Sequence, residues 1–221
     1  MNSTKRDIQL KHFIMRNFKL LSVVVLSILL SFSACKEDPI AVNDVKSKSV
    51  TLSRSTDYGN DWVYFSLVDG TEVSGLDETN SQTSDKWDIA FNRYNVRTNS
   101  GKSGSEMGGA YDAGKLAWET VTEAKESGYS TDTIIQIVKE FTGQGVNYMN
   151  SNGSKVFVDC ITMTYGPQGP VYSSQEHVYV IKTAKGKYAK LMITGFYNDE
   201  GVSGYVQFKY SYQNGDGNKF E

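Results

Sequence analysis

The chain has 221 residues, a formal net charge of −2, and only two Cys and two His. Aromatic residues make up 12% of it, more than a disordered chain carries, so at least one packed domain is expected. The near-neutral charge argues against a nucleic-acid-binding protein. Two Cys cannot form a disulfide framework, and two His offer little material for a His-rich metal site.

The first 34 residues have the pattern of a secretion signal. The basic head comprises Lys5, Arg6, Lys11, Arg16 and Lys19. A run from Leu20 to Phe32 follows that is apolar except for three Ser, and it is shorter than the roughly 20 residues that span a bilayer. Ser33-Ala34-Cys35 comes next and resembles a bacterial lipoprotein signal, which implies that Cys35 is lipidated and becomes the mature N-terminus.

The residues after Cys35 point to a location. Lys36-Glu37-Asp38 resembles the signal that sends lipoproteins of Bacteroidetes to the outer leaflet of the outer membrane. We therefore expect a lipid-anchored protein exposed on the cell surface, or also released from it, with a periplasm-facing anchor as the alternative. Without residues 1–34 the chain keeps 18 basic and 24 acidic residues, a net charge of −6, and His177 as its one His. Residues 35–47 are predicted to form the lipidated Cys and a flexible tether.

Residues 48–221 are predicted to form a single all-β, antiparallel domain, because segments rich in aromatic and β-branched residues alternate with Gly and Asn/Asp clusters. The predicted strands are residues 61–68, 86–92, 154–165, 177–183, 188–196 and 203–212. Residues 129–141 fit a helix or a strand, and their consecutive β-branched residues favour a strand. Two Gly-rich segments, 99–109 and 142–153, are predicted to be long loops, which are often functional.

The sequence contains no nucleophile-elbow, phosphate-loop or zinc motif, and hydrolase chemistry usually needs a nucleophile with an activating base. His177 opens a predicted strand and is expected to be a sheet residue. Cys160 shares its predicted strand face with Val156 and Val158, so we expect a small buried hydrophobe. We therefore predict a binding protein and not an enzyme.

Four Met lie beyond the signal. Met163 fits core patterning, and Met192 is predicted to be half-exposed on its strand. Met107 and Met149 instead fall in the two predicted loops, where no apolar pattern explains them. A thioether is a soft donor that can ligate haem iron, although two loop Met alone do not distinguish a haem site from chance.

Three motifs carry a family resemblance. Trp87 to Ala110 contains Trp-Asp-x-Ala-x-x-Arg-Tyr and a Gly-rich loop that closes on Gly-Gly-Ala. Trp62 to Ser66 forms an aromatic strand upstream, and Tyr165 to Tyr172 contains Gly-Pro-x-Gly-Pro-x-Tyr. Together they resemble the HmuY family of haem-binding lipoproteins over nearly the whole chain after the signal.

The resemblance implies an all-β fold whose long loops grip one haem b (iron protoporphyrin IX). It also implies a haemophore, which takes haem from host haemoproteins or other carriers and delivers it to a TonB-dependent outer-membrane receptor. The founding member uses two His ligands, but Asn92 occupies the first position and 142–153 contains no His. Other members are thought to use Met, so Met107 and Met149 are the expected axial ligands. Met192 or His177 in place of one of them is the alternative.

A second function remains open. A lipoprotein with the same β fold could bind a glycan or a protein through its Tyr-rich surface and its Gly/Asn loops, without haem.

Overall fold

The structure is a computed structural model that describes residues 44–221. The predicted signal, Cys35 and most of the predicted tether lie outside the described residues. Within the described part of the chain, no helix is long and apolar enough to cross a membrane.

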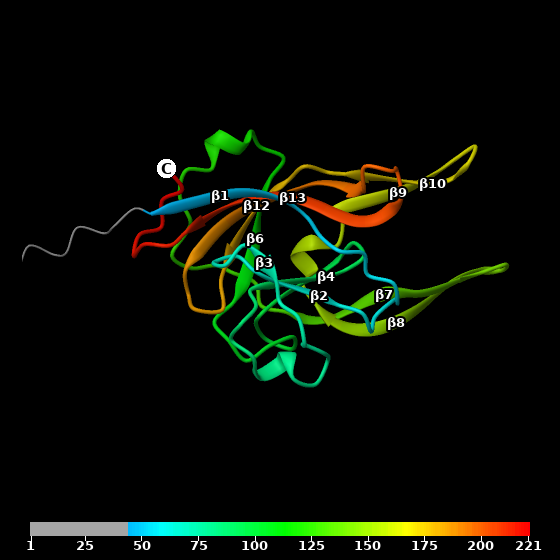
Figure 1. Cartoon of the computed structure of the whole chain (residues 1–221), viewed down its shortest axis with the longest axis horizontal. Coiled ribbons are helices and arrows are strands. Elements are labelled where there is room, and N and C mark those ends of the chain that lie inside the picture. The colour runs from blue at the N-terminus through cyan, green and yellow to red at the C-terminus, as the bar shows by residue number, and fades with distance from the viewer. Residues whose placement is uncertain (1–43) are drawn as a thin grey trace, which may run out of the picture. The chain divides into compact units, whose positions relative to one another are not determined.

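The last three strands form the centre of a five-stranded antiparallel sheet with the order β1-β13-β12-β11-β6 (Figure 1). They are β11 (Val178–Lys182), β12 (Tyr188–Tyr197) and β13 (Ser203–Gln213), and they confirm the three strands predicted at this end of the chain. The connecting turns contain Gly186 and Gly201, each with φ +76°, a backbone conformation that favours Gly.

Two strands that the sequence did not predict complete this sheet: β1 (Val45–Thr51) and β6 (Gly109–Gly114). Val45 pairs with Gln213 and Thr51 with Gln207, so the predicted tether extends three residues too far. β1 is mostly polar and exposed, and it owes its conformation to hydrogen bonding with β13, which local sequence preference does not reveal.

A second, four-stranded sheet has the order β3-β2-β4-β5 and confirms the predicted strands around residues 61–68 and 86–92. Its strands are β3 (Thr71–Glu72), β2 (Val63–Ser66), β4 (Ile89–Asn92) and β5 (Asn95–Thr98), and the 3₁₀ helix η1 (Ser81–Thr83) lies between β3 and β4. The core lies between the two sheets, where the Phe208 ring of β13 stacks on Phe91 and meets Phe65 edge-on, with centroids 5.5 and 5.3 Å away.

Residues 133–153 form a hairpin of β7 (Thr133–Thr142) and β8 (Gly145–Gly153). The strand interpretation of 129–141 is confirmed, and the loop prediction for 142–153 is wrong. Gly and Asn are poor strand formers in isolation. In β8, however, each Gly and Asn lies opposite a residue of β7 and takes part in the hydrogen-bonded ladder between the two strands. Met149 is therefore a strand residue, directly opposite Ile137.

The predicted strand at 154–165 is interrupted by a 3₁₀ helix, η3 (Lys155–Phe157). The strand β9 (Ile161–Gly166) begins after it and pairs with β10 (Gly169–Ser174). Cys160 is buried, as predicted, but it lies in a turn and its thiol donates to the Tyr94 carbonyl. Val158, which the sequence placed on the same buried face, is exposed.

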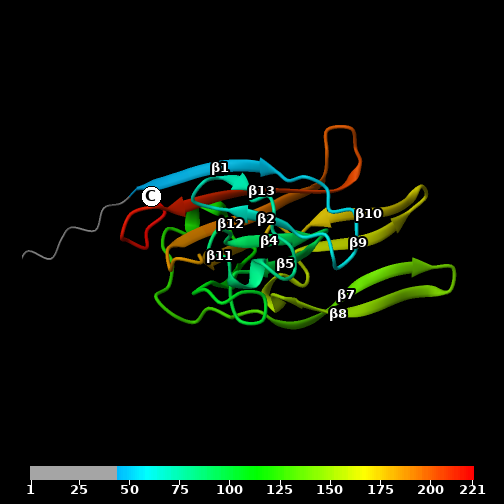
Figure 2. The same cartoon turned by 60° about the horizontal axis from the view of Figure 1, so that its bottom comes forward.

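The two hairpins, β7–β8 and β9–β10, extend from the same side of the sheets in both views (Figures 1 and 2). The second hairpin is fixed to the five-stranded sheet because the Tyr172 backbone N–H donates to the Tyr197 hydroxyl at 2.8 Å.

The outer face of the five-stranded sheet is also covered. The 3₁₀ helix η2 (Trp118–Thr120), Val121, Ala124 and the C-terminal Phe220 pack on it. Met192 lies beneath this cover with 8% of its surface exposed, so the prediction of a half-exposed Met192 is wrong.

Candidate functional site

An apolar groove lies between the β7–β8 hairpin and the segment that leads into β9. We call it the hairpin groove; its volume is about 210 Å³. It is lined by Tyr94, Asn95, Val96, Ile135, Gln136, Ile137, Val138, Phe141, Val146, Tyr148, Ser154, Phe157, Val158 and Met163. Ligand pockets are typically roughly 300–1,000 Å³, so a larger ligand would require the hairpins to move apart.

Three exposed apolar side chains line this groove: Phe141, Tyr148 and Val158. Six of the ten large hydrophobic residues that are exposed in the described chain lie on the two hairpins or beside η3: Ile134, Phe141, Tyr148, Val158, Tyr165 and Val171. Single exposed apolar residues are ordinary, but a cluster of them marks a binding surface. The side-chain chemistry suits a flat apolar ligand inserted between the hairpins.

One polar group in the groove has no partner. Ser154 is 2% exposed, and its hydroxyl makes no hydrogen bond within the described structure. Buried polar groups are nearly always hydrogen-bonded, so the hydroxyl is available to a ligand or to water.

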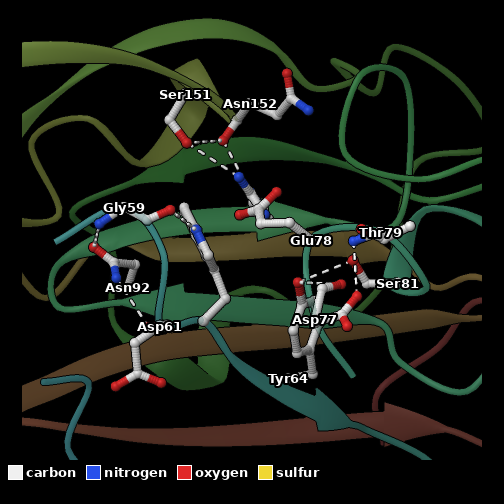
Figure 3. A network of polar contacts seen from close by, with 12 residues as sticks. Gly59, Asp61, Tyr64, Asp77, Glu78, Thr79, Ser81, Asn92, Ser151 and Asn152 are labelled. Carbon is white, nitrogen blue, oxygen red and sulfur yellow. Dashed lines mark hydrogen bonds and ion pairs between the residues drawn. The ribbon is translucent and has the colours of Figure 1, made fainter. Parts of the chain in front are cut away.

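Arg97 of β5 fastens the β7–β8 hairpin to the four-stranded sheet. Its Nε donates to the Asn152 carbonyl at 2.9 Å, one terminal nitrogen donates to Ser151 Oγ at 3.0 Å, and the other pairs with Glu78 at 2.7 Å. Figure 3 shows Ser151, Asn152 and Glu78 converging on this point. The guanidinium also stacks on Trp62, with its carbon 3.7 Å from the ring centroid. Arg97 thus anchors one wall of the groove.

Asn92 is fully buried and has a structural role. Its side-chain carbonyl accepts from Gly59 N at 3.0 Å, and its NH₂ donates to the Asp61 carbonyl (Figure 3). The NH₂ also donates to Ser55 Oγ and to the Asp57 carbonyl. The amide therefore holds segment 55–61 against β4, and both its oxygen and its nitrogen are used in those hydrogen bonds.

Met149 packs against the segment that Asn92 holds. A Cβ on Gly59 would lie 2.7 Å from its sulfur, so the close approach of the thioether requires Gly at this position, where φ is +85°. The Met149 side chain is half-buried and adjoins Ile137.

Met107 has different surroundings. It lies in the Gly-rich loop, is 58% exposed, donates its backbone N–H to Ala184, and packs its methyl group beside Gly186 of the β11–β12 turn. In the described structure the two thioethers contact different elements, and neither lines the hairpin groove.

Met163 is the thioether that lines the groove. The predicted core packing of Met163 is confirmed: its side chain is half-buried on β9 and packs against the main core, and it also lines the groove. A period-2 pattern cannot distinguish a strand face that meets the core from one that faces a groove.

His177 pairs with Asp112 of β6, its Nδ1 2.8 Å from the carboxylate, at the start of β11. The sequence predicted that His177 opens this strand, but β11 begins one residue later, at Val178, so His177 lies just outside the sheet. A search of the described residues finds no group of three or more His, Cys, Asp or Glu side chains arranged to hold a metal ion.

A larger hollow, about 580 Å³, lies elsewhere and is lined by acidic residues: Asp69, Glu72, Asp85 and Asp88. Lys86 and Lys185 also line it. Its polar lining and its excess of carboxylates suit an apolar or anionic ligand less well than the hairpin groove does.

Asp132 ties the Met107 loop to the base of β7. Its carboxylate accepts from Thr98 N at 2.9 Å and from Thr98 Oγ1 at 2.7 Å, while its backbone carbonyl accepts from Lys102. Burial raises the pKa of Asp132 to about 6, even though the hydrogen bonds from Thr98 act in the opposite direction.

This pKa predicts a pH dependence of stability. Because the folded-state pKa lies above the unfolded value of 3.8, the folded state binds more protons between pH 4 and 6. The contribution of Asp132 to the free energy of unfolding is therefore full below pH 4, falls as the pH rises from about 4 to 6, and is lost above that, by up to about 3 kcal/mol in total. Urea unfolding of wild type and Asp132→Asn at pH 4.5 and 7 checks this: the wild type should lose more stability with rising pH, and parallel pH profiles would contradict it.

The family model described as HmuY protein matches residues 58–210. The chain belongs to the HmuY family. No curated protein matches its sequence.

Solved structures agree with this HmuY fold. The apo HmuY analog of Tannerella forsythia is 23% identical, with a TM-score of 0.60, over 78% of this chain and 98% of that one. A candidate HmuY-like heme-binding protein of Bacteroides vulgatus is 22% identical, with a TM-score of 0.55, over 74% and 90%. A candidate lipoprotein of Bacteroides fragilis is 18% identical, with a TM-score of 0.54, over 76% and 89%. The structural similarity to these proteins confirms the predicted all-β fold, and the matched regions extend over most of each chain.

Proposed function

We propose that this HmuY-family protein binds haem b in the hairpin groove. The observation that carries the proposal is the apolar groove bordered by exposed aromatic and aliphatic side chains on two projecting hairpins. A porphyrin is flat and apolar on both faces, so insertion between the hairpins would bury those side chains and the macrocycle together. The description of the Bacteroides vulgatus relative as heme-binding supports the same ligand.

The axial ligands are proposed to be Met107 and Met149. Bringing their sulfurs to one iron requires the Met107 loop to leave Gly186 and the Met149 side chain to leave Gly59. Met163 is the second candidate because it already lines the groove. Haem iron supplies the coordination chemistry when it is bound, and the chain supplies thioether donors and an apolar enclosure.

The physiological role is proposed to be that of a haemophore anchored through Cys35 to the outer membrane. It would capture haem from host haemoproteins or other carriers and pass it to a TonB-dependent receptor. The Cys-Lys-Glu-Asp motif supports this location, as does a fold neighbour described as a candidate lipoprotein.

Titration of residues 36–221 with haem, in the ferric and ferrous states, tests the binding function. A saturable shift of the Soret band at one haem per chain is expected. No shift in either state would reject haem binding and leave the alternative, a lipoprotein that recognises a glycan or a protein.

Ligand identity can be tested with single Met→Ala variants at 107, 149 and 163. Soft thioether sulfur prefers ferrous to ferric iron, so we expect tighter binding and a clearer six-coordinate spectrum after reduction. Met107→Ala and Met149→Ala should each lose that spectrum, while Met163→Ala keeps it. Loss in Met163→Ala with no loss in Met107→Ala would replace Met107 by Met163. Unchanged spectra in all three variants would contradict thioether ligation.

A further inference from the structure

Arg93 is a buried cation without an anion. It occupies the turn between β4 and β5, is 8% exposed, and makes no side-chain hydrogen bond or ion pair within the described structure; its Nε is completely enclosed. Its backbone has φ +53°, a left-handed conformation that is unfavourable for a side chain of this size.

The surroundings of the guanidinium are aromatic. Its carbon lies 4.4 Å from the Tyr58 ring centroid and 5.8 Å from that of Phe196. The carboxylates of the adjacent segment already have other partners: Asp57 accepts from Asn60, and Asp61 accepts from Thr56.

This arrangement is costly in the absence of a ligand. The enclosed Nε has lost water without gaining a hydrogen-bond partner, and the cation–π contacts offset only part of that cost. Arg97, by contrast, lies on β5, the strand that follows the Arg93 turn. Its guanidinium pairs with the Glu78 carboxylate and donates to the Asn152 carbonyl. The chain thus contains one satisfied and one unsatisfied buried Arg beside the groove.

The unsatisfied guanidinium adjoins the hairpin groove. Tyr94, the next residue in the chain, lines the groove. The Tyr58 ring beneath the guanidinium meets Phe141, another lining residue, edge-on at 6.2 Å.

We propose that Arg93 binds a carboxylate of the ligand that occupies the hairpin groove. A guanidinium presents paired N–H donors that match the two oxygens of a carboxylate. The inference rests on the proposed haem site, since a porphyrin with propionate side chains carries both the apolar plane and the carboxylates. It adds a specificity-determining residue: Arg93 selects the diacid over a neutral porphyrin of the same shape.

The test compares two ligands on three proteins. Iron protoporphyrin IX and its dimethyl ester have the same macrocycle and differ in charge at the propionates. Each is titrated into the wild type, Arg93→Gln and Lys139→Gln, with Lys139 as an exposed cation of the β7–β8 hairpin. The wild type and Lys139→Gln should bind the diacid about 10- to 100-fold more tightly than the ester. Arg93→Gln should bind both with the affinity that the wild type has for the ester.

The ratio of the two affinities within one protein cancels any general effect of a substitution on the fold. An unchanged ratio in Arg93→Gln, or the absence of any preference in the wild type, would overturn the role of Arg93 while leaving haem binding intact. Failure of the wild type to bind either porphyrin would reject the proposed function itself and the inference with it. Arg93→Lys, which keeps the charge but not the fork, should retain part of the preference.

Discussion

Val158→Glu is expected to weaken haem binding by about 100-fold. Val158 lines the hairpin groove and is 57% exposed in the absence of ligand. A carboxylate at this position would be desolvated against the porphyrin face and would repel its propionates. Because the side chain is exposed, the substitution should leave the free energy of unfolding nearly unchanged. Soret titration measures the affinity, and urea unfolding measures the stability.

Val202→Glu provides the matched control. Val202 is also an exposed Val, 39% accessible, but it lies beside the β12–β13 turn and does not line the groove. Wild-type affinity in Val202→Glu together with weak binding in Val158→Glu would locate the ligand. Equal affinities in the two variants would mean that haem binds elsewhere.

Arg97→Ala is expected to reduce the free energy of unfolding by about 3 kcal/mol. The substitution leaves the Asn152 carbonyl and Ser151 without their donor, removes the stacking on Trp62, and unpairs Glu78. Breaking a buried, hydrogen-bonded charge cluster typically costs about 3–5 kcal/mol, and the lower end applies here because Glu78 is 40% exposed.

Urea unfolding of Arg97→Ala measures this loss. Lys185→Ala serves as its control because the Lys185–Asp85 ion pair is 3.0 Å long but exposed at both ends. We expect no measurable change in the control. A similarly small effect in Arg97→Ala would show that the hairpin does not depend on this anchor.

Strands with clear alternation were predictable from sequence. The segments that became β2, β4, β11, β12 and β13 have aromatic and β-branched residues between turn residues, and the consecutive Ile and Val of β7 also indicated a strand. The family resemblance of the Trp87–Ala110 motif is likewise confirmed.

The remaining strands depend on partners distant in the chain. β8 is rich in Gly and Asn, and β1 is largely polar, yet each completes a ladder with a neighbouring strand. The interruption at η3 depends on tertiary packing of Phe157 against Tyr179, with ring centroids 4.4 Å apart. Such contacts have no local sequence signal.

The candidate site was predictable only in part. Met107 and Met149 were selected because each lies in a Gly- or Asn-rich stretch and because the family resemblance implies ligands in those segments, and their role as ligands stays a prediction. Sequence analysis missed the groove itself, because the groove exists only where β7–β8 meets the η3–β9 segment. It also gave no indication that Arg93 and Arg97 are buried. No sequence signal indicates the positive φ of Arg93 or the stacking of Arg97 on Trp62.

Amide hydrogen exchange of residues 36–221, with and without haem, tests most directly whether the hairpin groove is the haem site. Exchange reports local opening along the backbone. Haem should slow exchange in β7, in β8 and around Tyr94 and Val158, while the turn at 198–202 and the segment 115–129 remain unchanged. Protection confined to those latter regions, or no change anywhere at saturating haem, would contradict the account.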